Sequence, residues 1–379
     1  MEPDVLPGGG TEAVAAWVME ALKKDYDVTL ITFSRVEADM LNQFYGTELE
    51  ETEISVIHPP FSSLLRRIRR LSMFKDHLMM RYCKYLHKRF DLFFAIGSGM
   101  DFGQKGIQYI AYGPGSKYVM VRGHDPALSG WYYLLKRSFA RACEMFSGYS
   151  EARLQGNVTL ATSAWTGKIL DDLYSGQDYE VVYPPVFTPE RKTGFHAKRD
   201  GFLCIARIIP EKMVDHAVEI LRRVRDNGYD VSLDIIGRAD DPGYFQEIKR
   251  LQAKHASWVS LQPVMPKDDL YALMDSNKYG INPALGEPSG VAALEMVKAG
   301  CIVFTRDGGG LPEIIDTPEV TYDSIDDGVD KITKVLSDNR LQQKVLDRLE
   351  EQGELFSAET FSKTIQRVSS DFFQTVDSA

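Results

Sequence analysis

The sequence has few of the features that mark secreted, membrane-spanning or nucleic-acid-binding proteins. It holds only 4 cysteines in 379 residues, none in a CxxC pair, which argues against a disulfide framework or a zinc site and fits a reducing cytoplasm. No run approaches the roughly 18 apolar residues that a membrane-spanning helix needs. The opening residues MEPDVLPGGG have no basic and apolar regions, so we expect no signal peptide. The net charge is −10, and we therefore expect no nucleic-acid partner.

The sequence does have enough apolar residues for two sizeable cores. Hydrophobic residues make up 44% of the chain, and its length suits two domains of about 150–190 residues. Strand-like and helix-like segments alternate along both halves, which is typical of βαβ units around parallel sheets. We therefore predict an α/β protein with two Rossmann-like domains.

A segment rich in prolines and charges, VVYPPVFTPERKTGFHAKRDG at 181–201, separates the two halves and shows no periodicity. We predict an N-terminal domain over 1–190 and a C-terminal domain over 191–357. The first strand of the N-terminal domain is short or missing, because little apolar sequence precedes the glycines that begin at Gly8. We predict that residues 358–379 form a helix beyond the second domain. This helix could pack back on the N-terminal domain.

The most informative stretch is NPALGEPSGVAALEMVKAG at 282–300. Glu287 lies just before a predicted helix, and Glu295 lies about two turns inside it. The first N–H groups of a helix have no partner within the helix, which makes this end an anion site. We predict one ligand with a sugar at Glu287 and a ribose diol at Glu295. Its phosphate would face the amides of Ser289, Gly290, Val291 and Ala292.

A second stretch, LCIARIIPEKMVDHAV at 203–218, offers two cations to a phosphate. Arg207 and Lys212 flank the turn after a predicted strand, and open α/β sheets bind ligands at the carboxyl ends of their strands. Arg grips phosphate with two N–H groups, and Lys supplies a compact charge. The alternative interpretation is a pair of solvated surface cations.

These residues resemble the family-4 retaining glycosyltransferases, whose GT-B fold has two Rossmann-like domains facing a central cleft. The E-x7-E element matches from Glu287 to Glu295, and the family's phosphate-binding Arg and Lys match Arg207 and Lys212. The stretch VVYPPVF resembles the interdomain region, and AGCIVFTRDGGGLPEII resembles the strand and loop after the E-x7-E helix.

The resemblance implies further donor contacts. LDIIGRADD places Gly237 before the donor pocket, and VSLQPVMPKDDLYALM places Pro263 and Val264 where the family backbone holds the nucleobase. PGGGTE at 7–12 resembles the glycine loop that faces the donor phosphates and the acceptor. This similarity implies donor contacts for Gly9 and Gly10 and an acceptor-side position for Gly8.

The sequence departs from the family on the acceptor side. Many members carry a His in a stretch like YIHYP, whereas this chain reads QYIAYGPG, with Ala111 or Tyr112 at that place. We assign Tyr112 to the acceptor side as a replacement hydrogen-bonding group. His124, in a loop of the N-terminal half, is the one histidine that we would test there.

The resemblance implies a retaining hexosyltransferase that uses a nucleotide sugar, with UDP-sugars favoured and GDP-mannose next. The acceptor would be a glycan or a lipid-linked sugar, in exopolysaccharide or cell-envelope synthesis. We expect no cofactor and no metal, since the DxD at 25–27 fits a turn on the far side of a sheet. The alternatives are a nucleotide- or glycan-binding protein of the same fold without catalysis, and a sugar phosphorylase or epimerase.

Residues 64–90 are rich in Arg and Lys, with Asp76 as the one acid. A basic amphipathic helix can lie on an anionic membrane, which would favour a lipid-linked acceptor and a peripheral place at the inner face of the membrane. A helix packed on the sheet with a solvated charged face is the other interpretation. The apolar stripe in question is Leu64, Leu65, Ile68, Leu71 and Phe74.

Overall fold

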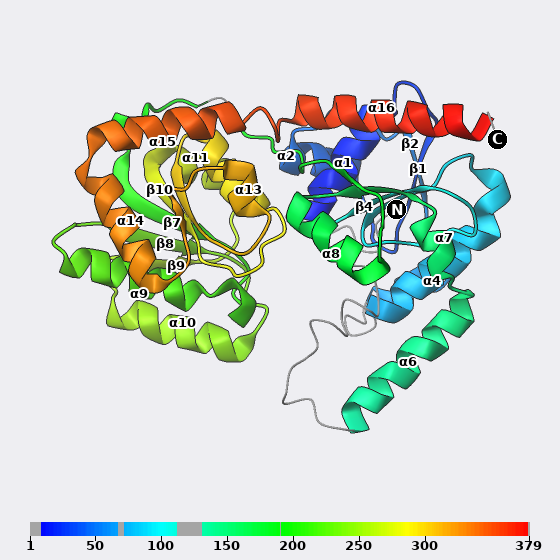
Figure 1. The fold of residues 1–379 in the computed structure, drawn as a ribbon, viewed down its shortest axis with the longest axis horizontal. Coiled ribbons are helices and arrows are strands. Elements are labelled where there is room, and N and C mark those ends of the chain that lie inside the picture. The colour runs from blue at the N-terminus through cyan, green and yellow to red at the C-terminus, as the bar shows by residue number, and fades with distance from the viewer. Residues whose placement is uncertain (1–8, 67–71, 112–130, 190, 378–379) are drawn as a thin grey trace. The chain divides into compact units, whose positions relative to one another are not determined.

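The chain folds into two compact units in a computed structural model that describes residues 9–66, 72–111, 131–189 and 191–377 (Figure 1). Unit 1 comprises Met1–Tyr183 together with Phe361–Ala379, and unit 2 comprises Pro184–Thr360. The sequence placed the corresponding boundaries after residues 190 and 357. The last helix therefore belongs to the first unit, although it follows the second in the chain.

Unit 1 is built on parallel strands. One sheet has the order β3-β4-β5-β6, and β1 pairs with β2 in a second sheet. The central strand β4 has all four residues buried, as expected for a parallel strand covered on both faces. The strands are β1 (Val28–Ile31), β2 (Ile54–Ile57), β3 (Phe94–Gly97), β4 (Ile107–Ile110), β5 (Val158–Ala161) and β6 (Glu180–Val181). The helices are α1 (Gly10–Leu22), α2 (Ala38–Tyr45), α3 (Ser62–Leu65), α4 (Ser72–Leu86), η2 (His87–Arg89), α6 (Trp131–Ser147), α7 (Glu151–Gln155), α8 (Ala164–Tyr174) and α16 (Ala358–Asp377).

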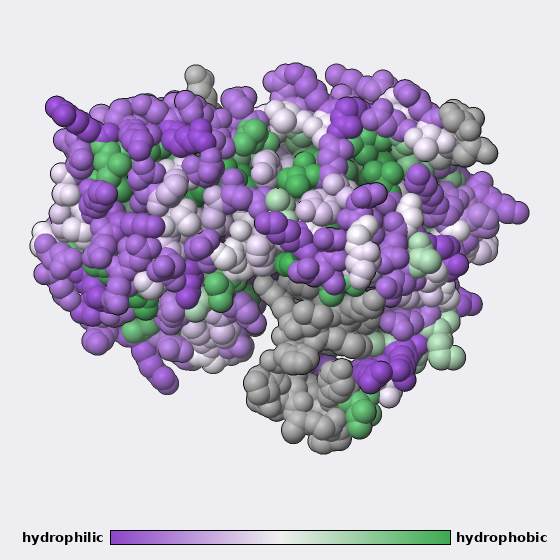
Figure 2. Space-filling view, in the orientation of Figure 1, coloured by the Kyte–Doolittle hydropathy of each residue, from purple (hydrophilic) through white to green (hydrophobic). Residues whose placement is uncertain are grey.

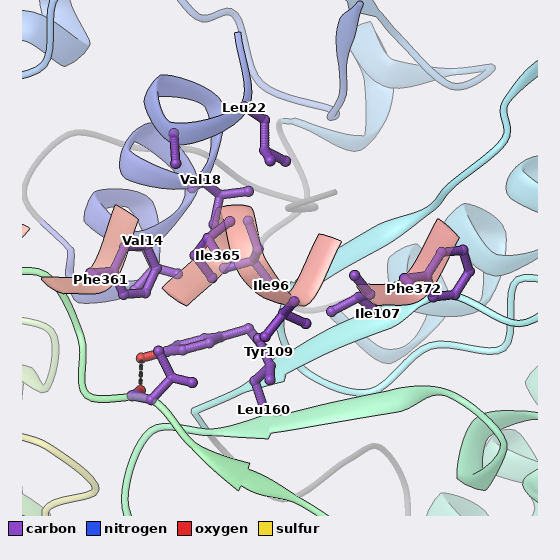
Figure 3. Packing of buried hydrophobic residues seen from close by; sticks show 14 residues of the cluster. Val14, Val18, Leu22, Ile96, Ile107, Tyr109, Leu160, Phe361, Ile365 and Phe372 are labelled. Carbon is purple, nitrogen blue, oxygen red and sulfur yellow. Dashed lines mark hydrogen bonds between the residues drawn. The ribbon is translucent and has the colours of Figure 1, made fainter. Parts of the chain in front are cut away.

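Helix α16 completes the core of unit 1 (Figure 3). Phe361 and Ile365 pack with Val14 of α1, and the Phe361 ring meets Tyr109 edge-on with 5.9 Å between ring centroids. The buried Tyr109 hydroxyl donates a hydrogen bond to the Val182 carbonyl at 2.9 Å. Each aromatic side chain buried in this way removes a large apolar area from water, so the helix is a structural part of unit 1.

The basic segment 64–90 packs mainly inward where the structure describes it. Leu65 is buried, Phe74 packs against the same core, and α4 buries Met79 and Cys83 there. Leu64 is exposed. The predicted stripe also includes Ile68 and Leu71, which lie outside the described residues. The described members of the stripe are therefore divided between the core and the surface.

Unit 2 is a six-stranded parallel sheet with the order β12-β11-β10-β7-β8-β9. The central strand β7 contains a fully buried run at Phe202 and Leu203. The strands are β7 (Arg199–Ile205), β8 (Ser232–Ile236), β9 (Val259–Gln262), β10 (Asn277–Asn282), β11 (Ile302–Arg306) and β12 (Thr321–Tyr322). The helices are η3 (Phe195–Ala197), η4 (Pro210–Lys212), α9 (Val214–Asp226), α10 (Pro242–Lys254), α11 (Lys267–Ser276), α12 (Val291–Lys298), α13 (Leu311–Ile315), α14 (Ile325–Ser337) and α15 (Asn339–Gln352).

Local sequence sets where the helices of unit 2 begin. Helix α10 starts with Pro242 after Asp241, whose carboxylate accepts a hydrogen bond from the Tyr244 amide at 2.8 Å. Helix α14 begins after Ser324, which caps the Asp327 amide. Across the described parts of both units, no helix combines the length and the apolar character needed to cross a bilayer.

Candidate functional site

The predicted donor residues of the C-terminal half gather at one edge of the unit 2 sheet. All strands of this sheet run parallel, so their carboxyl ends share an edge, which is where open α/β sheets bind ligands. The loops at this edge follow β7, β8, β9, β10 and β11. They carry Arg207, Gly237, Pro263 with Val264, residues 287–292, and residues 308–310 respectively.

Glu287 and Lys212, predicted from separate stretches, form an ion pair between Lys212 Nζ and Glu287 Oε2. The Lys212 side chain is 19% exposed and that of Glu287 is 12% exposed. Arg207 is exposed on the same loop as Lys212. The pair is thus shielded from bulk water yet open enough to meet a ligand, and Coulomb attraction is stronger there than at the surface.

The glycine run at 308–310 fixes the backbone of Glu287. The Gly310 amide donates a hydrogen bond to the Glu287 carbonyl at 2.8 Å. A side chain at Gly309 would place its Cβ only 2.5 Å from that carbonyl oxygen, so this close approach requires glycine. The loop after β11 therefore holds the predicted sugar-binding glutamate in place.

The E-x7-E helix begins slightly later than the sequence indicated. Helix α12 starts at Val291, and Gly290 is its N-cap with a φ of 65°, a left-handed conformation that favours glycine. Ser289 and Gly290 are buried, and Val291 and Ala292 are partly buried. The first amides of the helix therefore belong to the residues that the sequence assigned to phosphate.

Glu295 is paired with Lys267, a residue that the sequence analysis missed. Lys267 Nζ lies 2.5 Å from Glu295 Oε1, and the two side chains are 12% and 11% exposed. The Lys267 ammonium also lies 5.1 Å from the centre of the Tyr271 ring, within cation–π range. Lys267 begins α11 and lies within the stretch that carries Pro263 and Val264, four and three residues before it. That position was the one signal available in the sequence.

Two further features shape this edge. A Cβ at Gly237 would lie 1.8 Å from the Ala206 carbonyl oxygen. The loop after β8 can therefore lie this close to the end of β7 only because residue 237 is a glycine. Pro263 and Val264 are exposed, with Val264 at 62%, which leaves this backbone accessible to a flat ring. Burial raises the pKa of the Cys204 thiol in β7 to about 12, so this thiol is no nucleophile at neutral pH.

In unit 1, the structure places Gly9 as the N-cap of α1 and Gly10 as its first residue. A Cβ on Gly9 would lie 2.0 Å from the Glu12 carboxylate, which leans over this turn. The predicted acceptor-side residues Gly8, Tyr112 and His124 lie outside the described residues. The DxD at 25–27 lies between α1 and β1, where Tyr26 stacks on Phe373.

In the described ranges, no group of three or more His, Cys, Asp or Glu side chains gathers in a way that could hold a metal ion. The two acidic residues of the E-x7-E element each contact a lysine instead. Positive charge at this edge is supplied by Arg207, Lys212 and Lys267 and by the beginning of α12.

Comparisons with known proteins agree with this geometry. Residues 188–354 match the family model described as "Glycosyl transferases group 1". The "GDP-Man:Man(3)GlcNAc(2)-PP-Dol alpha-1,2-mannosyltransferase" of Dictyostelium discoideum is 23% identical over 228 residues, which are 54% of this chain and 45% of the relative. The chain thus spans less than half the length of that curated relative.

Solved structures match nearly the whole chain. WaaG, a glycosyltransferase involved in lipopolysaccharide biosynthesis, matches 96% of this chain and 97% of its own, with 16% identity and a TM-score of 0.67. Anabaena Alr3699/HepE, solved with UDP and glucose, matches 98% of this chain and 100% of its own, with 13% identity and a TM-score of 0.65. The chain has the GT-B fold, and its residues 188–354 are similar to the glycosyl transferases of group 1.

Proposed function

We propose that this chain moves a hexosyl group from a nucleotide sugar to a hydroxyl of a glycan or a lipid-linked sugar, with retention at the anomeric carbon. The observation that carries the proposal is the pair of glutamates at the carboxyl edge of unit 2. Glu287 and Glu295 lie on either side of the beginning of α12, and each is held by a lysine ammonium. This arrangement offers two carboxylates to hydroxyl groups and several positive groups to the diphosphate between them.

The leaving diphosphate would be stabilised by three sources of positive charge. The first amides of α12 carry the positive end of the helix dipole. Arg207 supplies a planar fork that can bind two phosphate oxygens, and Lys212 supplies a compact charge. Groups that are already in place where charge develops lower the barrier to bond cleavage, so we expect no metal requirement.

Lys212 and Glu287 would each contact a different part of the donor while they stay paired with each other. The ammonium that holds Glu287 can also reach an arriving phosphate, because one lysine has three N–H donors. Glu287 would then orient the sugar through hydroxyl groups that donate to its carboxylate. The hydrogen bond from the Gly310 amide to the Glu287 carbonyl holds the backbone of Glu287 in place while Lys212 is shared.

Glu295 would accept hydrogen bonds from the ribose diol, with Lys267 holding the carboxylate in the correct orientation. The exposed backbone at Pro263 and Val264 would receive the nucleobase. We favour a UDP-sugar, with GDP-mannose next. HepE, which shares the fold, was solved with UDP and glucose, and the name of the curated relative specifies GDP-Man.

Retention would follow from attack on the same face as the departing diphosphate. The bond from the anomeric carbon to the diphosphate oxygen breaks, and the acceptor oxygen forms the new bond. The acceptor proton passes to the departing diphosphate, which acts as the base. No carboxylate in the N-terminal half stood out in the sequence as a nucleophile for a covalent intermediate.

We place the acceptor among glycans or lipid-linked sugars, in exopolysaccharide or cell-envelope synthesis at the cytoplasmic side of a membrane. The name of the curated relative specifies a Dol-linked acceptor, and WaaG is involved in lipopolysaccharide biosynthesis. All four cysteines are buried thiols, which suits a reducing compartment. The sequence placed the membrane contact at 64–90, and this remains a prediction.

A nucleotide-release assay tests the proposal. The full chain is incubated with UDP-glucose, UDP-galactose, UDP-N-acetylglucosamine, GDP-mannose or ADP-glucose, with and without EDTA. We expect slow release from one donor at an unchanged rate in EDTA. Nucleotide binding by calorimetry without release from any donor, even with sugar acceptors added, would instead support the non-catalytic binding protein.

A further inference from the structure

Arg306, the last residue of β11, lacks the kind of partner that a shielded cation usually has. In the view of Figure 2 the surface of unit 2 is mostly hydrophilic, and charged side chains at such a surface meet water or an opposite charge. Arg223 of α9, for example, pairs with Asp326. Arg306 is only partly exposed, and no carboxylate of the described residues pairs with it.

The Arg306 guanidinium instead contacts a thioether and an imidazole. Its Nη1 lies 3.2 Å from the Met213 sulfur and 3.4 Å from His216 Nδ1. Because a guanidinium has only N–H donors, both of these atoms act as acceptors. A shielded cation without a carboxylate partner costs folding free energy, and residues that carry such a cost are more often kept for function than for stability.

Met213, which Arg306 contacts, has an unfavourable backbone conformation. Its φ of 48° and ψ of 40° lie in the left-handed region, which a residue with a side chain rarely adopts. Met213 follows Lys212 directly, ends η4 and caps α9 at the same time. Its amide donates to the Pro210 carbonyl at 3.0 Å, and its carbonyl accepts from the His216 amide at 3.0 Å. The turn that carries Lys212 is therefore strained, and such a turn persists only where its surroundings support it.

The end of β11 contacts the loops of both members of the Lys212–Glu287 ion pair. Arg306 pairs in register with β12, so its backbone is fixed in the sheet. From there its side chain reaches the turn that follows Lys212. Gly310, on the same loop, donates its amide to the Glu287 carbonyl. The short segment 306–310 therefore supports the lysine and the glutamate together.

We propose that Arg306 is a positioning residue for Lys212. By holding the left-handed turn at Met213, its guanidinium keeps the Lys212 ammonium where it meets both Glu287 and the donor diphosphate. This inference rests on the proposed function, in which Lys212 binds the diphosphate. Arg306 itself contacts neither the sugar nor the phosphates in this arrangement, so its loss acts through Lys212.

Calorimetry on the full chain tests this proposal with two pairs of probes, UDP against uridine and GDP against guanosine. The ratio of the two affinities in a pair measures what the phosphates contribute. Arg306→Met should lower the affinity for the diphosphate by about tenfold and leave that for the nucleoside within about twofold. Arg306→Gln should show the same pattern with a smaller loss. Arg306→Lys should retain most of the affinity, because an ammonium also has several N–H donors.

A double-mutant cycle shows whether Arg306 acts through Lys212. In a Lys212→Met background, Arg306→Met should have little further effect on the affinity for the diphosphate. Hydrogen exchange without ligand gives a second readout. In Arg306→Met, the amides of Met213 and His216 should exchange about tenfold faster, whereas those of β8 keep the wild-type rate. Arg223→Met is the matched control, because it removes the same charge from the same unit, and it should leave both readouts unchanged.

The possible outcomes separate this inference from the proposed function. Equal losses for the diphosphate and the nucleoside would show a general structural role for Arg306 and overturn the inference. Losses that add to those of Lys212→Met, or unchanged exchange at Met213, would also overturn it. In each of these cases nucleotide binding by the wild type leaves the proposed donor site intact. Absence of nucleotide binding by the wild type would reject the proposed function and this inference with it, even if the exchange rates change as expected.

Discussion

Each unit contains lysines paired with shielded carboxylates, but the two sets of pairs differ in how fully the carboxylate is satisfied. In unit 1, Asp101 is 0% exposed and accepts hydrogen bonds from Lys84 at 2.7 Å and from two nitrogens of Arg153 at 2.9 Å. The amides of Gly103 and Ser150 donate two more. In unit 2, among the described residues, Glu287 and Glu295 each contact one lysine side chain.

This difference separates a structural ion pair from one that can bind a ligand. The lone pairs of Asp101 are occupied, so its cluster ties α4, α7 and the end of α6 together and accepts nothing further. Burial raises the pKa of Asp101, but the hydrogen bonds from Arg153, Lys84 and the two amides outweigh it, and its pKa lies below the ordinary value of 3.8. Glu287 and Glu295 keep lone pairs for hydroxyl groups.

Replacing Asp101 should give the largest effect, and this effect should be on the free energy of unfolding and not on nucleotide binding or transfer. Asp101→Asn leaves Lys84 and Arg153 without their shared carboxylate, and we expect a loss of about 3 kcal/mol in the free energy of unfolding of unit 1. Urea unfolding measures this loss. Asp230→Asn is the control, since Asp230 pairs with Arg225 while 95% exposed and should change stability by under about 0.5 kcal/mol.

The Asp101 carboxylate also determines how the free energy of unfolding changes with pH. Because the folded pKa of Asp101 is lowered, its stabilising contribution is present above the ordinary value of 3.8 and is lost as the pH falls through the folded pKa. The stability gap between the wild type and Asp101→Asn should therefore narrow below about pH 4. A gap that stays constant into acid would contradict the role of the ionised carboxylate.

Replacing Glu287 should affect the rate of transfer and leave nucleotide binding nearly unchanged. We expect Glu287→Ala to lower transfer by about 10²- to 10³-fold, as when one preorganised group at a reacting centre is removed. Calorimetry with the free nucleotide should show a change under about threefold. Glu211→Ala, on the Lys212 loop, is the control. A loss of nucleotide affinity as large as the loss of rate would refute the sugar-orienting role.

Replacing Glu295 should weaken nucleotide binding itself. A charged acceptor for a ribose diol is worth about 1.5–3 kcal/mol, so Glu295→Ala should lower affinity by about tenfold or more. The sharper readout is the preference of the wild type for UDP or GDP over the 2′-deoxy nucleotide, which the variant should lose. If the wild type and Glu295→Ala prefer the ribonucleotide over the 2′-deoxy nucleotide by the same factor, the ribose lies elsewhere.

Replacing Lys267 should give the smallest effect. Like the replacement of Glu295, it should lower the affinity for the nucleotide. Lys267→Met leaves Glu295 in place without its partner, and we expect a loss of about fivefold in nucleotide affinity. Lys267→Arg should restore most of it, whereas Lys267→Met combined with Glu295→Ala should be no weaker than Glu295→Ala alone. Additive losses would show that Lys267 acts independently of Glu295.

The sequence was most informative where function depends on local spacing. Arg207 and Lys212 follow one strand, and Glu287 and Glu295 flank one helix start, so strand and helix signals were enough to place them on one edge. Their grouping follows from the parallel order of the strands, which alternating β and α segments predict.

The sequence was uninformative where side chains meet across long intervals. The position of Lys267 near Pro263 and Val264 does not by itself identify Glu295 of another helix as its partner, and nothing near Asp101 indicates a cluster with Lys84 and Arg153. The sequence also left two interpretations of 64–90 open, because a basic apolar stretch has the same composition whether its apolar residues point inward or outward. The packing shows that Leu65 and Phe74 point inward, whereas Leu64 is exposed.

The packing of α16 on unit 1 makes the order of synthesis matter. Ile365 and Phe372 fill a core whose other members include Val14 and Leu160, so residues near both ends of the chain close one hydrophobic interior. As the chain leaves the ribosome, unit 1 lacks this helix until all of unit 2 has been made. A premature stop codon just before Phe361 would spare every residue at the E-x7-E edge, yet would leave the first-made unit with an open core for chaperones and proteases to recognise.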